Sequence, residues 1–185
     1  MRSRSNAALF WPVLVVVLAF DVITKAIAER ALLRGIPEEV FGSVVRLRLV
    51  YNPGAAFGLD LGPQSRWIFA ALTIIALVIL SRLYRSTPAG HSARAVALAL
   101  VCSGALGNLI DRVRSFFGVV DFIDVGVGDA RWPTFNVADM AVSVGAGLLA
   151  WVLWQEDQST QGTAAAVSPV VVPASASGGE PGDLV

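Results

Sequence analysis

Charged and metal-binding residues are scarce in this chain. It has one cysteine, Cys102, and one histidine, His91, which excludes a disulfide framework and a zinc site built on these residue types. The 14 basic and 14 acidic residues give a net charge of zero, so no basic excess is available to neutralise nucleic-acid phosphates. Phosphate-binding glycine motifs are also absent. Any chemistry must therefore come from carboxylates, amides and hydroxyls, and we expect neither a metal nor a cofactor.

Apolar residues, in contrast, are abundant. They make up 55% of the 185 residues, and mean hydropathy is +0.67, whereas soluble domains are about 45–50% apolar. A helix needs about 20 residues to cross a bilayer, and four apolar stretches approach that length: residues 7–28, 67–84, 94–110 and 135–154. We therefore predict an all-α membrane protein, a bundle of four transmembrane helices. The apolar run at the start of the first stretch, residues 7–20, could instead be a cleaved signal peptide, but Asp21 and Lys25 follow it in place of a cleavage site.

Two connecting segments have the pattern of short strands. Val45–Tyr51 alternates apolar and basic residues, which is typical of a half-exposed strand, and the Asn-Pro-Gly sequence at 52–54 follows it as a turn. Gly118–Ile123 indicates a second short strand or an interfacial segment. We expect the strand at Val45–Tyr51 to form a small β platform over one end of the bundle.

The C-terminal segment differs in composition from the rest of the chain. From Gln155 onward it is rich in Ala, Ser, Gly, Pro and Val and contains neither Lys nor Arg. Such a composition cannot bury a core of its own. We therefore predict a transmembrane domain over residues 1–154 and a disordered tail over 155–185.

The distribution of arginines leaves the orientation in the membrane open. An even number of spans puts both termini on one side, and cytoplasmic loops usually carry the basic excess. Five arginines fall on the side of the termini and eight on the other side. The first group is Arg2, Arg4, Arg82, Arg85 and Arg94, and the second is Arg30, Arg34, Arg46, Arg48, Arg66, Arg112, Arg114 and Arg131.

Polar residues near the membrane gather at one end of the predicted bundle. An ionisable group in a bilayer is costly, so each one is a candidate functional residue. In an up-down bundle, the ends of the first and third spans, the start of the fourth and the loops between them all lie on the same side. The residues brought there are Asp21, Thr24, Lys25, Asn52, Asn108, Asp111, Arg112, Asp121, Asn136 and Asp139.

Several of these residues also have a purely structural explanation. Asp21 and Lys25 lie one helical turn apart and could form an ion pair that neutralises itself. Asp111 could pair in the same way with the adjacent Arg112. Asn108 could bridge two helices, because amides join helices in membranes. The residues alone leave these alternatives open.

Asp121 and Asp139 are harder to explain structurally. Asn136 could cap the fourth span, but no basic residue follows Asp139 within that span, and Asp121 lies between Val120 and Phe122. Two carboxylates near one rim can share a proton and act as acid and base. The alternative is a small four-span transporter with a carboxylate proton relay. A transporter usually carries polar groups along its whole path, whereas the acids here cluster at one rim.

Five motifs together resemble bacterial lipoprotein signal peptidase, also called signal peptidase II. They occur in order over about residues 8–154 and with the spacing of that family. They are Asp21-x-x-Thr24-Lys25, Asn52-Pro53-Gly54-Ala55-Ala56-Phe57, Gly107-Asn108-Leu109-Ile110-Asp111-Arg112, Val119-Val120-Asp121-Phe122 and Phe135-Asn136-Val137-Ala138-Asp139.

The resemblance implies a membrane aspartic endopeptidase with Asp121 and Asp139 as its catalytic pair. Such an enzyme removes the signal peptide of prolipoproteins on the N-terminal side of a diacylglyceryl-modified cysteine. The resemblance also implies cytoplasmic termini, an active site at the outer leaflet of the bacterial cell membrane and an extracytoplasmic β platform. The C-terminal tail is not part of the family pattern.

The other polar residues at this rim are predicted to support the reaction. Amides and a guanidinium would orient the substrate and stabilise developing charge, and Asp111 would hold Arg112 or act as an alternative catalytic acid. The supporting set is Asn52, Gly54, Asn108, Asp111, Arg112, Asn136, Ala138, Asp21 and Lys25. The expected partners are lipid-modified prolipoproteins and membrane lipid, and we expect a monomer that binds no nucleic acid.

Overall fold

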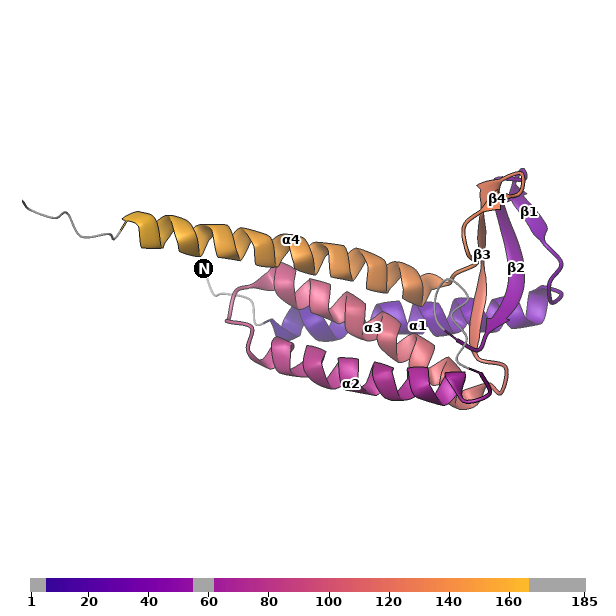
Figure 1. Ribbon diagram of the computed structural model, residues 1–185, viewed down its shortest axis with the longest axis horizontal. Coiled ribbons are helices and arrows are strands. Elements are labelled where there is room, and N and C mark those ends of the chain that lie inside the picture. The colour runs from indigo at the N-terminus through magenta and orange to yellow at the C-terminus, as the bar shows by residue number, and fades with distance from the viewer. Residues whose placement is uncertain (1–5, 55–61, 167–185) are drawn as a thin grey trace, which may run out of the picture. The chain divides into compact units, whose positions relative to one another are not determined.

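The computed structural model describes residues 6–54 and 62–166, with side chains described up to residue 158 (Figure 1). In chain order, the elements are α1 (Ala7–Ala31), β1 (Glu38–Phe41), β2 (Val45–Asn52), α2 (Ser65–Arg85), α3 (Ser92–Arg114), β3 (Val119–Val127), β4 (Ala130–Arg131) and α4 (Val137–Ala166). Among the described residues, four helices are long and apolar enough to cross a membrane. The four predicted spans are thus confirmed, and so is the small sheet.

The chain divides into two compact units, residues 1–153 and 154–185. The division lies next to the domain boundary predicted at residue 154. The described part of the second unit is the end of α4, which is helical to Ala166. The predicted disorder of residues 155–166 therefore differs from the structure, because glutamine, glutamate and alanine in this stretch favour a helix. The rest of the predicted tail lies outside the described residues.

Helix α3 is the centre of the first unit, and both α1 and α2 pack against it. Its buried side chains are mostly small, and small residues allow helix backbones to approach closely in a membrane. A Cβ atom at Gly104 would overlap the carbonyl oxygen of Ala138 in α4. A Cβ atom at Gly107 would overlap the carboxylate of Asp21 in α1. The glycines of α3 therefore let α1 and α4 approach the residues of the candidate site.

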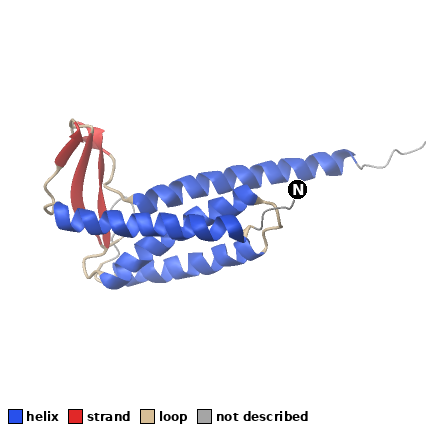
Figure 2. Ribbon diagram, turned by 180° about the vertical axis from the view of Figure 1, so that it is seen from behind, coloured by secondary structure: helices blue, strands red, loops and turns tan. Residues whose placement is uncertain are grey.

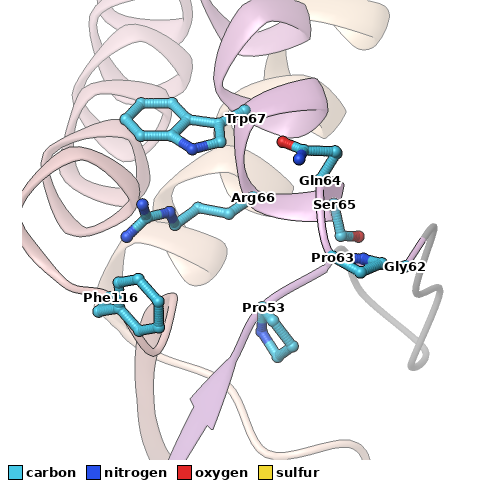
Figure 3. A pocket seen from close by; sticks show the side chains of 8 residues that line it. All are labelled: Pro53, Gly62, Pro63, Gln64, Ser65, Arg66, Trp67 and Phe116. Carbon is cyan, nitrogen blue, oxygen red and sulfur yellow. The ribbon is translucent and has the colours of Figure 1, made fainter.

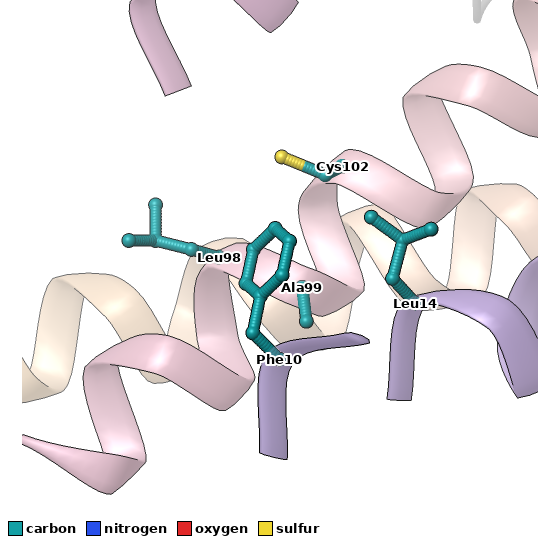
Figure 4. Packing of buried hydrophobic residues seen from close by; sticks show 5 residues of the cluster. All are labelled: Phe10, Leu14, Leu98, Ala99 and Cys102. Carbon is teal, nitrogen blue, oxygen red and sulfur yellow. The ribbon is translucent and has the colours of Figure 1, made fainter. Parts of the chain in front are cut away.

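An apolar cluster joins α1 to α3 near the N-terminal end of α1. Figure 4 shows Phe10 and Leu14 of α1 against Leu98, Ala99 and Cys102 of α3. The ring of Tyr84 from α2 stacks on Phe10 with 3.9 Å between centroids. Most large side chains on α1 and α2 are exposed outside these contacts, as expected where lipid replaces water as the solvent.

The strands form one antiparallel sheet in the order β1-β2-β3-β4, which stands at one end of the helices (Figures 1 and 2). Strand β2 pairs with β3 so that Val50 is opposite Asp121, after a register shift between Leu47 and Val50. Leu49, Val120 and Phe122 bury their side chains against the end of α1. This packing fixes β3, and with it Asp121, on the end of the bundle.

Asp124, which the sequence analysis did not single out, joins three strands of the sheet. Its carboxylate is 2.7 Å from Arg46 of β2 and 2.6 Å from Arg131 of β4. The two arginines hold the pKa of Asp124 below its ordinary value against the effect of burial. Two of the eight arginines counted on this side therefore have a structural role.

A pair of glycines on α4 tests the close packing of this helix on α3. A Cβ atom at Gly145 would lie 2.8 Å from Leu100 Cβ and 2.9 Å from the carbonyl oxygen of Ala97, whereas one at Gly147 would have nothing within 4 Å. We expect Gly145→Ala to destabilise the fold by about 1–3 kcal/mol through overpacking. Gly147→Ala should be neutral or stabilising by up to about 1 kcal/mol through helix propensity. Thermal unfolding in detergent measures both, and equal midpoints would contradict the packing.

Candidate active site

The first turn of α4 is closed by a reciprocal pair of hydrogen bonds. The backbone N–H of Asp139 donates to Asn136 Oδ1 at 2.9 Å, and the backbone N–H of Asn136 donates to Asp139 Oδ2 at 3.1 Å. This is a capping-box arrangement, in which two side chains satisfy backbone donors that a helix start leaves unpaired. The predicted capping role of Asn136 is confirmed, and the cap fixes the carboxylate of Asp139 at the positive end of a helix dipole.

The same Asn136 side chain also reaches Asp121 on β3. Its Nδ2 donates to Asp121 Oδ1 at 2.7 Å, while Asn52 Nδ2 lies 3.3 Å from Asp121 Oδ2. Asp121 is only 3% exposed. Burial raises its pKa to about 7, and repulsion from the nearby carboxylate of Asp139 adds to this shift. One asparagine thus bridges the two carboxylates that the sequence predicts to be the catalytic pair.

Asn108 connects Asp139 to the interior of the bundle. Its Nδ2 donates to Asp139 Oδ1 at 2.8 Å. Its Oδ1 accepts from Lys25 Nζ at 2.9 Å and from Asn136 Nδ2 at 3.2 Å. The predicted bridging role between helices is confirmed, and one end of the bridge is a candidate catalytic carboxylate.

Lys25 and Asp21 form the predicted ion pair, with 2.8 Å between Nζ and Oδ2. Lys25 also lies 2.9 Å from Asp111 of α3, so the pair is part of a larger cluster. Asp21 Oδ1 in turn accepts the backbone N–H of Ala138 at 2.8 Å. Side chains of α1 therefore contact both α3 and the start of α4 beside the site.

The predicted pairing of Asp111 with Arg112 is not what the structure shows. Asp111 contacts Lys25 and Arg114, each at 2.9 Å, and accepts the N–H of Val120. Arg112 instead donates to the carbonyl oxygen of Gly54 at 3.0 Å and to that of Asn108. Successive residues of a helix point in different directions, so neighbours in sequence do not face each other. Asp111 is directed into the bundle and does not line the cavity, which leaves its role as an alternative catalytic acid without support.

A cavity of about 490 Å³ brings the candidate residues together. Its polar wall is Asn52, Asn108, Arg112, Asp121 and Asp139. The remaining wall is mostly apolar and comes from α2, α3, β3, α4 and the segment before α4. It consists of Thr73, Ala76, Leu80, Val101, Ala105, Val119, Trp132, Pro133, Thr134, Phe135, Val142 and Ser143. Sequence analysis missed this apolar wall. Its one signal was Thr73, the only polar residue between Trp67 and Leu80.

A second hollow, of about 610 Å³, lies at the start of α2 and contains none of the candidate catalytic residues (Figure 3). The guanidinium of Arg66 lies 4.5 Å from the ring centre of Trp67 and 5.2 Å from that of Phe116. It donates to the carbonyl oxygen of Ser115 at 2.6 Å. Tryptophan and arginine at the end of a span are typical of a membrane interface.

In the described part of the chain, no three histidine, cysteine or carboxylate groups converge as metal ligands.

The raised pKa of Asp121 predicts how stability depends on pH. The folded-state pKa is about 7, whereas an unfolded aspartate titrates near about 3.9. Between these values the folded state binds more protons, so this residue's contribution to stability is present at low pH and is lost as pH rises through about 7. The slope is at most about 1.4 kcal/mol per pH unit.

Asp121→Asn should remove this contribution, so the variant should gain stability relative to the natural chain as pH rises from 5 to 8. Thermal unfolding at both pH values measures the difference. Asp129→Asn, at an exposed turn position, is the control and should track the natural chain. A constant stability difference between Asp121→Asn and the natural chain at both pH values would contradict the buried, protonated state.

Comparisons with known proteins show the family to which the chain belongs. A family model described as signal peptidase (SPase) II matches residues 13–155. The lipoprotein signal peptidase of Paraburkholderia phytofirmans is 40% identical over 151 residues, covering 80% of this chain and 86% of the relative. That of Moorella thermoacetica is 41% identical over 137 residues, covering 74% and 87%. A solved bacterial membrane enzyme superimposes with a TM-score of 0.77 at 31% identity, covering 86% and 95%. The chain is therefore a multi-pass membrane peptidase of the signal peptidase II family.

Proposed function

We propose that this chain removes the signal peptide from diacylglyceryl-modified prolipoproteins, with Asp121 and Asp139 as an aspartic catalytic pair. Cleavage occurs on the N-terminal side of the lipid-modified cysteine. One observation carries the assignment of the pair. Both carboxylates line one cavity, and a single side chain, Asn136, donates to Asp121 and caps the helix that carries Asp139.

Two carboxylates that share one proton supply the acid and the base for peptide hydrolysis. The ionised carboxylate takes a proton from water, whose oxygen attacks the scissile carbonyl carbon. The protonated carboxylic acid gives its proton to the leaving amine. Asn52 and Arg112 line the same cavity, where their N–H groups can hold the peptide and stabilise the charge that develops on the carbonyl oxygen.

The apolar wall of the cavity is suited to a lipid-modified substrate. On α2 it runs from Thr73 to Leu80, which is about 10 Å of helix at 1.5 Å per residue. An apolar part of the substrate can lie along this wall while its peptide bond reaches the carboxylates. The lipid therefore serves to hold the bond at the depth of Asp139, a positioning effect more than a gain in affinity. The substrate, membrane lipid and a single copy of the chain complete the proposed assembly.

The proposed orientation has cytoplasmic termini and places the sheet and the active site at the outer leaflet of the bacterial cell membrane. The arginine count did not decide the orientation, and at least four of the eight arginines on the sheet side are committed to internal contacts. Arg46 and Arg131 pair with Asp124, Arg114 pairs with Glu29 and Asp111, and Arg112 binds backbone carbonyls. Positive-inside statistics concern free charges in loops, so these four do not oppose the orientation.

The transporter alternative gains no support from the arrangement of polar groups. The described ionisable residues of the site lie at the sheet end of the bundle. At the other end, the cluster of Phe10, Leu14, Leu98, Ala99 and Cys102 fills the space between α1 and α3. A proton path would need polar groups through that layer.

Exchange of either catalytic carboxylate for an amide tests the pair. Asp121→Asn and Asp139→Asn should each lower cleavage by at least about 100-fold, since an amide cannot exchange the required proton and acid–base catalysis is worth about 100- to 10,000-fold. A gel-shift assay on a lipid-modified prolipoprotein in detergent or liposomes measures the loss. Asp129→Asn, at the exposed turn, should cleave normally. Turnover near that of the natural chain in either catalytic variant would refute the assignment.

Substrate lipidation tests the role of the apolar wall. At saturating concentration, the lipid-modified prolipoprotein should show a much higher kcat than the unmodified form. Ala105→Leu, which extends a side chain into the cavity, should reduce this preference. Ala71→Leu adds the same atoms at an exposed position of α2 and should leave it unchanged. Equal kcat values for the two substrates would contradict positioning by lipid while leaving the aspartate pair in place.

A further inference from the structure

Lys25 makes one contact more than an ion pair requires. Its side chain is 1% exposed, and its charge is already matched by Asp21 at 2.8 Å and Asp111 at 2.9 Å. The third contact, at 2.9 Å, is to Oδ1 of Asn108, whose other end reaches Asp139. Lys25 is therefore separated from a proposed catalytic carboxylate by a single amide group.

The chemistry of lysine determines which way this amide points. An ammonium group has three donors and no acceptor, so the Asn108 atom that faces it must be the oxygen. Asn136 Nδ2 donates to the same oxygen at 3.2 Å. The NH₂ group of Asn108 is consequently directed at Asp139 Oδ1, 2.8 Å away. Without Lys25 the amide could rotate and present its oxygen to the carboxylate.

Both oxygens of Asp139 then face donors. Oδ1 receives the Asn108 NH₂ group, and Oδ2 receives the backbone N–H of Asn136 at 3.1 Å. Hydrogen bonds donated to a carboxylate favour its charged form, and the start of α4 adds the positive end of a helix dipole. A proton on either oxygen of Asp139 would place an O–H donor next to an N–H donor.

The surroundings of Asp121 are looser on one side. Oδ1 receives Asn136 Nδ2 at 2.7 Å, but Oδ2 has its nearest described donor, Asn52 Nδ2, at 3.3 Å. Burial disfavours its charge and raises its pKa to about 7. Of the described donors to the two carboxylates, Asn52 Nδ2 is the most distant from its acceptor, so a proton shared by the pair is best placed on Oδ2 of Asp121.

We propose that Lys25 is a positioning residue for the reaction. By holding the Asn108 amide, it keeps Asp139 ionised as the general base and leaves the shared proton on Asp121. Asp139 then takes a proton from the attacking water as the new C–O bond forms, and Asp121 gives its proton to the amine as the C–N bond breaks. Transfer of the proton from Asp139 to Asp121 restores the starting state. This inference rests on the proposed function.

The pH–rate profile tests the role of Lys25. Among the described residues, the charged or titratable groups around the Lys25–Asn108 contact are Asp21 of α1, Asp111 and Arg112 of α3, Asp121 of β3 and Asp139 of α4. In Lys25→Met, the Asn108 amide is free to turn, and protonation of Asp139 becomes easier. We expect the acidic limb of kcat to move up by about one pH unit, an approximately 10-fold loss at pH values well below the limb, with little change in KM. Lys25→Arg should return the acidic limb to its position in the natural chain.

A matched control separates positioning from ion pairing. Asp111→Asn removes an ion-pair partner of Lys25 but keeps the contact between Lys25 and Asn108, so the acidic limb should stay in place whatever stability is lost. If Lys25→Met does not fold, the double variant Lys25→Met/Asp21→Asn removes both charges and keeps an acceptor for the Ala138 N–H. The proposal is overturned if the acidic limb of kcat does not move in Lys25→Met. It is also overturned if the limb moves by the same amount in Asp111→Asn.

Infrared spectroscopy locates the proton without any substrate. At pH 5, the C=O band of protonated carboxyl groups should lose intensity in Asp121→Asn and keep it in Asp139→Asn. The opposite pattern overturns the proton assignment, whether or not prolipoprotein is cleaved. The expected pattern in a chain that does not cleave lipid-modified prolipoprotein supports the assignment and makes the proposed function the part that fails.

Discussion

The cost of burying charge inside a membrane protein is the constraint on which the rest of this structure depends. An unpaired charge in a low-dielectric interior costs several kcal/mol, and removal of one partner leaves the other uncompensated. The structure meets this cost by placing Lys25 within 2.9 Å of both Asp21 and Asp111. Lys25 and Asp21 lie on α1, whereas Asp111 lies on α3. The ion pairs that neutralise Lys25 therefore also hold α1 against α3, and Gly107 of α3, which has no side chain, leaves room for the Asp21 carboxylate.

The sheet solves a second problem, which is to bring a carboxylate from outside the helices to the end of α4. Strand β3 is held on one side by β2 and on the other by a bridge between Ile123 and Phe135, just before α4 begins. Asp124 strengthens the far end of the sheet through Arg46 and Arg131. The position of Asp121 therefore depends on pairing along the whole of β3. The hydrogen bond from Asn136 to Asp121 then fixes β3 relative to α4, the helix that carries Asp139.

Much of the fold followed from patterns that the sequence displays directly. Apolar length predicted the spans, alternation predicted β2, and helical spacing placed the polar residues at one rim. The partners of Asp111 could not be predicted, because adjacency to Arg112 in sequence conceals that the two side chains diverge on a helix. The apolar wall of the cavity was also invisible, since Ala76 and Ala105 have no feature that separates a cavity lining from a lipid-facing surface. On the residues alone, the peptidase and the transporter stayed open, and the family resemblance decided between them.

Three asparagines surround the carboxylates, and the same physical argument explains each of them. The oxygen of Asn108 is held by the Lys25 ammonium, that of Asn136 by the N–H of Asp139, and that of Asn52 by the N–H of Gly54 at 3.0 Å. Ammonium and backbone N–H groups can only donate, so every one of these amides must direct its NH₂ group at a carboxylate. An aspartate at any of the three positions has the same shape but would place an acceptor against an acceptor. Asparagine is thus the side chain that joins obligate donors to two carboxylates while leaving the charge of the pair unchanged.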